Sequence, residues 1–340
     1  MNLRSRLPLL CAVAMASCAH ATTPAIKIPL TPADKLCAEH PPSDGAMCLP
    51  TAKIDHLLRD GDLTVLQARA TSSGTNGAMT MWLEFPKDGI VLKAKWKEAA
   101  RGGSAINNEP RKELAAYALQ KLFLEPDDYV VPPTQSRCIP LDVYKTDVRP
   151  SHPTFKDTSC AFGVLAYWLS DVKELNGYDK NRFETDIAYR TTIANLNVFG
   201  YLFNHRDTRP ANFVIAKSAE HPRAFAIDNG LALNGITNPR TIVLHEWSNI
   251  VVPKIPFALV DRLRKLTRKD LDSLATVAEF AIDKGQLEAI PVTDAFEDSD
   301  GVRQKGNVIQ LGLTRHEIDQ IEERLKKLLE RVDSKKLEQY

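Results

Sequence analysis

The strongest constraint on this chain is the spacing of one amide and two carboxylates between positions 204 and 230. Asp207 is followed five residues later by Asn212, and Asp228 comes directly after the apolar run 224–227. Carboxylate and amide oxygens are the ligands that Mg²⁺ prefers in proteins. A fold that brings these three side chains together can therefore hold a divalent cation and keep one carboxylate for proton transfer.

The same spacing is typical of phosphoryl-transfer sites. Kinases carry an Asp followed five residues later by an Asn, and then an Asp-x-Gly after a strand; here Asp228 begins the sequence Asp-Asn-Gly. Because the phosphoryl group leaves through a loose, highly charged transition state, the protein mainly positions groups and supplies charge. We assign Asp207 as the base for an attacking hydroxyl, and Asn212 and Asp228 as ligands of Mg²⁺ (or Mn²⁺).

Such a site also needs a cation on the phosphates of ATP. Lys93 lies in the alternating segment 90–96, and Glu113 lies on the helix expected next, so they could supply this cation and its partner. Lys95 shares a strand face with Lys93 and is its main rival. The turn with Gly74 and Gly77 could direct backbone N–H groups to phosphate oxygens, although it lacks the G-x-G-x-x-G spacing.

Taken in order, these segments resemble the atypical kinases, a group that includes type II phosphatidylinositol 4-kinases, HipA-like kinases and secretory-pathway kinases. The resemblance covers about residues 60–235 and rests on positions 91–95, 113–117, 131–134, 194–213 and 226–231. It implies that Lys93 is the ATP lysine, Glu113 its partner, Asp207 the catalytic aspartate, and Asn212 and Asp228 the metal ligands.

The chain departs from the protein-kinase pattern at two places. Asn229 stands where the protein kinases have the Phe of D-F-G, and no A-P-E sequence follows. A Phe-driven switch and a conventional activation loop are therefore not expected, and Arg206 has no evident phosphorylated residue to bind.

The resemblance and the residue patterns together predict an α+β, two-lobed kinase-like fold. We expect a β-rich lobe over 54–169 and a mostly helical lobe over 170–335. Alternation and turn residues predict strands at 63–66, 79–85, 90–96, 135–139, 161–168, 213–216 and 224–227. Helical spacing predicts helices at 111–124, 187–203, 257–266, 270–284 and 315–332.

The N-terminal segment reads as an export signal. Arg4 and Arg6 precede an apolar run at 7–16 that is too short to span a bilayer, which predicts a signal peptide over 1–21. Processing has two interpretations: a lipoprotein with Cys18 as its lipidated first residue, or ordinary cleavage after 19–21. Residues 22–53 are rich in proline and read as a tether. Periplasm or cell envelope, including the outer membrane for a lipoprotein, is the expected location.

The remaining cysteines agree with export. Cys37, Cys48, Cys138 and Cys160 are an even set, as disulfides in an oxidising compartment require. We expect Cys37–Cys48 to close the tether and the strand pair to set Cys138 opposite Cys160. The alternative is four free buried thiols. No C-x-x-C occurs, which argues against a zinc or thioredoxin-like site.

The charge balance bears on partners. With 44 Lys+Arg and 43 Asp+Glu the chain is close to neutral, which argues against binding nucleic acid through bulk charge attraction. The sequence thus predicts an exported ATP-dependent phosphotransferase acting on a hydroxyl of a protein, glycan, lipid or small molecule. Membrane contact is expected only through a lipid on Cys18.

Two other functions use the same residues: AMP transfer by a site that binds ATP in a flipped orientation, and a non-catalytic scaffold in the cell envelope. At the residue level, Asp207 and Asn212 also suit turn caps. Lys93 and Glu113 also suit a solvated surface, and a structural role is favoured for His205.

Overall fold

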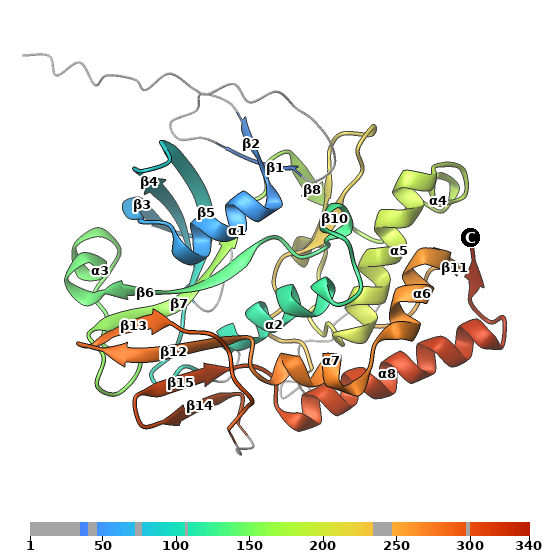
Figure 1. The fold of residues 1–340 in the computed structure, drawn as a ribbon. Coiled ribbons are helices and arrows are strands. Elements are labelled where there is room, and N and C mark those ends of the chain that lie inside the picture. Colours follow the sequence, from blue (N-terminus) through green and yellow to red (C-terminus); the bar gives the residue numbers. More distant parts are fainter. Residues whose placement is uncertain (1–34, 40–45, 72–76, 106–107, 234–246, 297–299) are drawn as a thin grey trace, which may run out of the picture.

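The computed structural model describes residues 35–39, 46–71, 77–105, 108–233, 247–296 and 300–340 (Figure 1). Within them the chain is a mixed α/β protein with several sheets. The signal peptide expected over 1–21, Cys18 and Gly74 lie outside the described residues, as do parts of the expected tether.

A five-stranded antiparallel sheet forms the first part of the molecule, in the order β3-β4-β5-β7-β6. Its strands are β3 (Thr64–Ala70), β4 (Met79–Phe85), β5 (Ile90–Glu98), β6 (Thr134–Pro140) and β7 (Cys160–Tyr167). The strands expected from alternation are all present. On β5 the even positions Leu92, Ala94 and Trp96 are fully buried, so the lysines at the odd positions share the opposite face.

Three helices accompany this sheet: α1 (Thr51–Asp60), α2 (Pro110–Lys121) and α3 (Leu141–Asp147). A hairpin of β1 (Lys35–Glu39) and β2 (Ala46–Pro50) precedes them. The hairpin is attached to the sheet, because Leu36 and Leu49 join its core and the carbonyl of Cys37 accepts from the backbone N–H of Ser170 at 2.8 Å. The described part of the segment expected as a tether is therefore packed on the sheet.

The second part is mainly helical and surrounds α5 (Ile187–Leu202), which carries many of its core residues. Its other helices are α4 (Lys180–Thr185), α6 (Phe257–Lys265), α7 (Arg268–Asp272) and α8 (Arg315–Asp333). Three short strands form a sheet in the order β10-β9-β8: β8 (Val172–Glu174), β9 (Phe213–Ala216) and β10 (Ala224–Ala226). β11 (Lys254–Ile255) pairs in parallel with β16 (Glu338–Gln339). Single 3₁₀ turns occur at Pro126–Asp128, Pro210–Asn212 and Ser273–Ala275.

The helix expected over 270–284 is wrong in its second half, where a four-stranded antiparallel sheet begins. Its strands are β12 (Ala278–Asp283), β13 (Gln286–Ala289), β14 (Val302–Lys305) and β15 (Val308–Leu311), in the order β13-β12-β15-β14. Lys284 and Gly285 have φ of 47° and 81°, which closes a two-residue hairpin turn. Phe280 of this sheet packs on Phe162 of β7, so residues counted with the helical lobe cover the first sheet (Figure 1).

Both expected cysteine pairs are formed as disulfides, Cys37–Cys48 and Cys138–Cys160. The first joins residues directly opposite each other in the β1–β2 hairpin. The second joins β6 to the first residue of β7, with Cα atoms 5.5 Å apart. Two disulfides fit an oxidising environment and hence an exported protein. Across the described ranges, none of the helices has the length and apolar character needed to cross a bilayer.

Candidate functional site

Three charged side chains from distant parts of the chain meet beside the first sheet. The Nζ atom of Lys97 lies 2.8 Å from Oε1 of Glu113 and 3.0 Å from Oδ1 of Asp228. Lys97 and Glu113 are nearly sealed, with 7% and 9% of their side chains exposed, whereas Asp228 keeps 28%. Lys95 completes the group, because its Nζ atom lies 3.0 Å from Oδ2 of Asp228.

The local sequence explains how these side chains meet. Pro110 is the first residue of α2, where its missing N–H costs nothing, and Glu113 lies in the first turn, where a carboxylate is favoured by the helix dipole. Asp228 follows β10, whose Ala226 donates its backbone N–H to Val130 at 2.7 Å. The backbone N–H of Asn229, the residue after Asp228, donates to Oε2 of Glu113 at 3.0 Å. Glu113 thus contacts both Lys97 and the backbone beside Asp228.

Lys93 does not pair with Glu113, so that expectation is wrong. Its Nζ atom lies over the rings of Trp168 and Trp82, 4.6 Å and 5.4 Å from their centroids. Positions 93, 95 and 97 share one face of β5, and α2 crosses this face at the end that carries Lys97. Alternation alone identifies the face but not the position along it, which is why sequence reasoning missed Lys97.

Asp207 and Asn212 lie in the segment between α5 and β9. Both carboxylate oxygens of Asp207 accept from Arg209, each at 2.7 Å. The side-chain amide of Asn212 donates to the backbone carbonyl of Asp207 at 2.9 Å, and its own backbone carbonyl accepts from Ile227 at 3.0 Å. Asn212 therefore ties the Asp207 segment to Ile227, the residue directly before Asp228.

The charges of the group determine its protonation. Burial alone would lower the pKa of Lys97, but Glu113 and Asp228 outweigh it and raise that pKa well above its usual value. Burial would likewise raise the pKa of Asp228, yet the charges of Lys97 and Lys95 hold it well below the ordinary range. Lys97 is thus an ammonium and Asp228 a carboxylate at any physiological pH.

The imidazole ring of His205 is buried. Burial lowers the pKa of His205, while the charges of Asp228, Asp207 and Glu113 act on it in the opposite direction. Its ring packs on Phe213 with centroids 4.8 Å apart. The lowered pKa keeps the imidazole neutral near neutral pH.

The donor chemistry at Asp228 suits a magnesium ion shared with a nucleotide. Mg²⁺ in such sites takes one or two carboxylates and completes its shell with waters and substrate phosphates. Asp228 and the amide oxygen of Asn212 are donors of this type, and the buried oxygens Oγ1 of Thr208 and Oδ1 of Asn229 have no protein hydrogen-bond partner. In the described part of the chain, no group of three or more His, Cys, Asp or Glu side chains is placed to hold a metal ion.

Of the two glycines expected near phosphate, only Gly77 can be placed. It has φ of 64°, and its carbonyl accepts from Arg149 at 2.8 Å. The strand that follows begins at Met79, opposite Trp96. Gly77 therefore lies at the end of the first sheet that carries Lys97.

Comparison with known proteins adds no name to this arrangement. Neither a scan against protein-family models nor a search among curated proteins finds a match.

Proposed function

We propose that this protein is an exported ATP-dependent phosphotransferase with a two-lobed kinase-like fold. It transfers the γ-phosphoryl group of ATP to a hydroxyl of an acceptor in the periplasm or cell envelope. The observation that carries the proposal is the contact of Lys97 with both Glu113 and Asp228. Among the described residues, this contact joins β5, α2 and the segment after β10, and Asn212 ties Asp207 to Ile227 directly before Asp228.

The positions of these residues in the fold support the proposal. In protein kinases the ATP lysine lies on the third strand, pairs with a glutamate of the next helix, and works with an aspartate that holds Mg²⁺. Lys97 lies on β5, the third strand of its sheet in chain order, and Glu113 lies on α2, the helix that follows. This assignment replaces Lys93 with Lys97 and keeps the other expected roles.

Each residue then has a chemical task. Lys97, fixed by Glu113, binds phosphate oxygens of ATP, and Lys95 adds charge beside it. Asn212 and Asp228 would hold Mg²⁺, which supplies charge neutralisation at the phosphates when bound. Lys95 is more exposed than Lys97, at 23% against 7%, so it is the cation better able to move away from Asp228.

Asp207 accepts the proton of the attacking hydroxyl. The hydroxyl oxygen forms a bond to the γ-phosphorus while the bond to the β–γ bridging oxygen breaks, and ADP leaves with that electron pair. Arg209 occupies both oxygens of Asp207, and 66% of its side chain is exposed. Arg209 must therefore release at least one oxygen before the hydroxyl can bind there.

The test uses the purified protein with MgATP labelled at the γ-phosphate. We expect label on the protein or on added envelope extract, with Asp207→Asn lowering the rate by about 10²-fold or more, as loss of a general base does. The matched control is Asp142→Asn, on the exposed side of α3, which should keep the wild-type rate. Equal rates for Asp207→Asn and wild type would overturn the role of Asp207.

Two further measurements separate the other functions. The mass of the modified acceptor distinguishes phosphate from AMP. Nucleotide binding distinguishes an enzyme from a scaffold, since MgATP at a hundred times its dissociation constant stabilises a binding protein by about 2.7 kcal/mol. No thermal shift with any nucleotide would leave the scaffold as the better description.

A further inference from the structure

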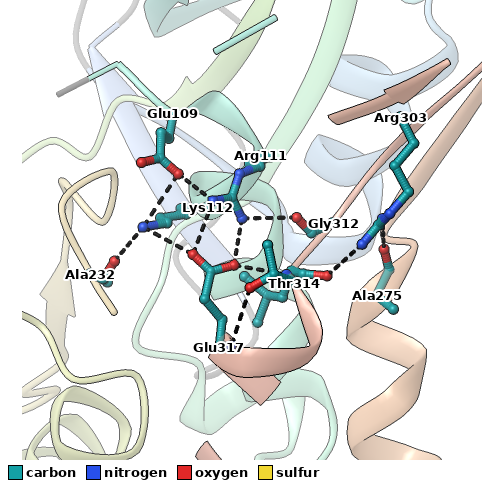
Figure 2. Close-up of polar contacts among 10 residues, drawn as sticks. Glu109, Arg111, Lys112, Ala232, Ala275, Arg303, Gly312, Thr314 and Glu317 are labelled. Carbon is teal, nitrogen blue, oxygen red and sulfur yellow. Dashed lines mark hydrogen bonds and ion pairs between the residues drawn. The ribbon is translucent and has the colours of Figure 1, made fainter. Parts of the chain in front are cut away.

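A second cluster of buried charges lies at the start of α2 (Figure 2), next to Glu113 in the sequence. It consists of Glu109, Arg111 and Lys112 from the beginning of α2 and Glu317 from the first turn of α8; we call it the anchor cluster. Arg111 binds both oxygens of Glu317, at 2.6 Å and 2.9 Å, and also contacts Glu109. Lys112 lies 3.2 Å from Glu317 and 3.3 Å from Glu109.

The anchor cluster also holds backbone from two other segments. Arg111 donates to the carbonyl of Gly312, at the junction of β15 and α8, at 3.0 Å. Lys112 donates to the carbonyl of Ala232 at 2.8 Å. Ala232 lies four positions after Asp228, and Lys112 precedes Glu113 directly. One side chain thus connects the helix that carries Glu113 to the segment that carries Asp228.

The cluster is sealed and its charges balance. The exposed fractions of the side chains are 0% for Lys112, 7% for Glu317, 8% for Arg111 and 13% for Glu109. Two cations face two carboxylates, and Glu317 also caps α8 by accepting from the backbone N–H of Thr314 at 2.8 Å. Because a buried charge that loses its partner is strongly destabilising, few alternative arrangements of α2 can satisfy these groups.

We propose that Lys112 and Glu317 are positioning residues that hold α2 at the distance where Glu113 meets Lys97. Glu317 fixes the start of α2 on α8, and Lys112 fixes α2 on the segment after Asp228. The lysine–glutamate pair is then assembled in the resting protein without an activating signal. The positioning of α2 does not depend on the proposed function. Only the effect of that positioning on phosphoryl transfer rests on it.

The test measures the environment of Lys97 directly and needs no activity. The folded protein is treated with a small amine-acylating reagent, and modification of Lys97 is followed by peptide mass spectrometry. Lys112→Met removes the link to Ala232 and the ion pairs of Lys112 with Glu109 and Glu317, but leaves Arg111 on Glu317. If α2 loosens, Glu113 leaves Lys97 and the rate of acylation should rise about fivefold or more, the lower range for coupling between elements.

The matched control is Arg303→Met. Arg303 is a buried cation of the same neighbourhood that donates to the carbonyls of Ala275 and Leu313 (Figure 2), and these contacts bind the C-terminal sheet and not α2. Each variant removes a buried cation that donates to backbone carbonyls. Both should therefore have a lower free energy of unfolding than the wild type. Only Lys112→Met should expose Lys97; equal Lys97 acylation in the two variants would overturn the positioning role.

A second measurement on the unmodified protein covers the case in which Lys112→Met fails to fold. Hydrogen exchange of the first turns of α2 should be as slow as that of the first turn of α8, because the anchor cluster joins them into one unit. Much faster exchange in α2 overturns the proposal. Absence of phosphoryl transfer together with slow exchange and a protected Lys97 would instead contradict the proposed function alone.

Discussion

The site cluster (Lys95, Lys97, Glu113 and Asp228) and the anchor cluster have the same composition, two cations and two carboxylates, and each includes residues of α2. They differ in access to solvent. In the site cluster Asp228 and Lys95 remain 28% and 23% exposed, whereas in the anchor cluster Lys112 and Glu317 are 0% and 7% exposed. The first turn of one helix therefore contributes to an open group of charges and to a closed one.

The partners differ as well. Three members of the anchor cluster also contact backbone: Arg111 and Lys112 bind carbonyls, and Glu317 caps a helix. Asp228 has two lysine ammonium groups as its side-chain partners, and lysine is a mobile point charge that a metal ion or a phosphate can replace. The comparison indicates that sealed, backbone-bound charges fix geometry, whereas exchangeable ones are available for binding.

The largest effect is expected when a member of the anchor cluster is removed. Glu317→Ala leaves Arg111 and Lys112 buried without their main counter-charge, and breaking a buried pair in this way costs about 3–5 kcal/mol of the free energy of unfolding. Urea unfolding measures it. Asp228→Ala should cost clearly less, because Lys97 keeps Glu113 and Lys95 reaches solvent. Equal losses in the two variants would show that the clusters do not differ in this respect.

The reverse order is expected for activity. Asp228→Asn keeps the shape of the side chain but removes its charge, and loss of one electrostatic group from a reacting site lowers the rate by about 10²–10³-fold. Initial rates of phosphoryl transfer at saturating MgATP measure this. Glu317→Gln, assayed at a temperature where it is folded, should be less impaired in rate than Asp228→Asn. A larger loss of rate in Glu317→Gln would contradict the assignment of Asp228.

Acid should weaken the anchor cluster within a defined range. Burial would raise the pKa of Glu317, but hydrogen bonds from Arg111 and the charges of Arg111 and Lys112 lower it from 4.5 to about 2. Its contribution is therefore complete above pH 4.5 and is lost as pH falls from 4.5 towards 2. The gap in unfolding free energy between wild type and Glu317→Gln should narrow by about 3 kcal/mol across this range. A constant gap would mean that Glu317 has an ordinary pKa.

Much of the fold follows from local pattern. The five strands of the first sheet show alternation or apolar runs between turn residues, and α5 begins at an Asp186 cap and carries a continuous apolar surface. The sheet of β12 to β15 was missed because its first strand lies within 270–284, where helical spacing predicted a helix. Its two-residue turns at Lys284-Gly285 and Gly306-Asn307 were the available signal.

The site was predictable in part. The sequence pointed to Glu113 and Asp228, which lie together on Lys97, and to Asp207 and Asn212, which are joined by a hydrogen bond. It could not select Lys97, because three lysines alternate on one face of β5. The anchor cluster could not be predicted from the sequence, because Arg111 and Glu317 are 206 positions apart. Charged residues near helix starts are also normally solvated.

The smallest effect on the free energy of unfolding is expected near neutral pH, from His205. Because burial lowers the pKa of His205 below its unfolded value of 6.5, the unfolded chain binds this proton first as pH falls. Stability should therefore decline below pH 6.5, with a slope of at most about 1.4 kcal/mol per pH unit from this one group. His205→Phe should lose this slope between pH 6.5 and 5, whereas Glu317→Gln should retain it, since Glu317 titrates at lower pH in both states. Urea unfolding of both variants at half-unit pH steps measures these slopes. An unchanged slope in His205→Phe would mean that His205 does not cause the loss of stability in this range.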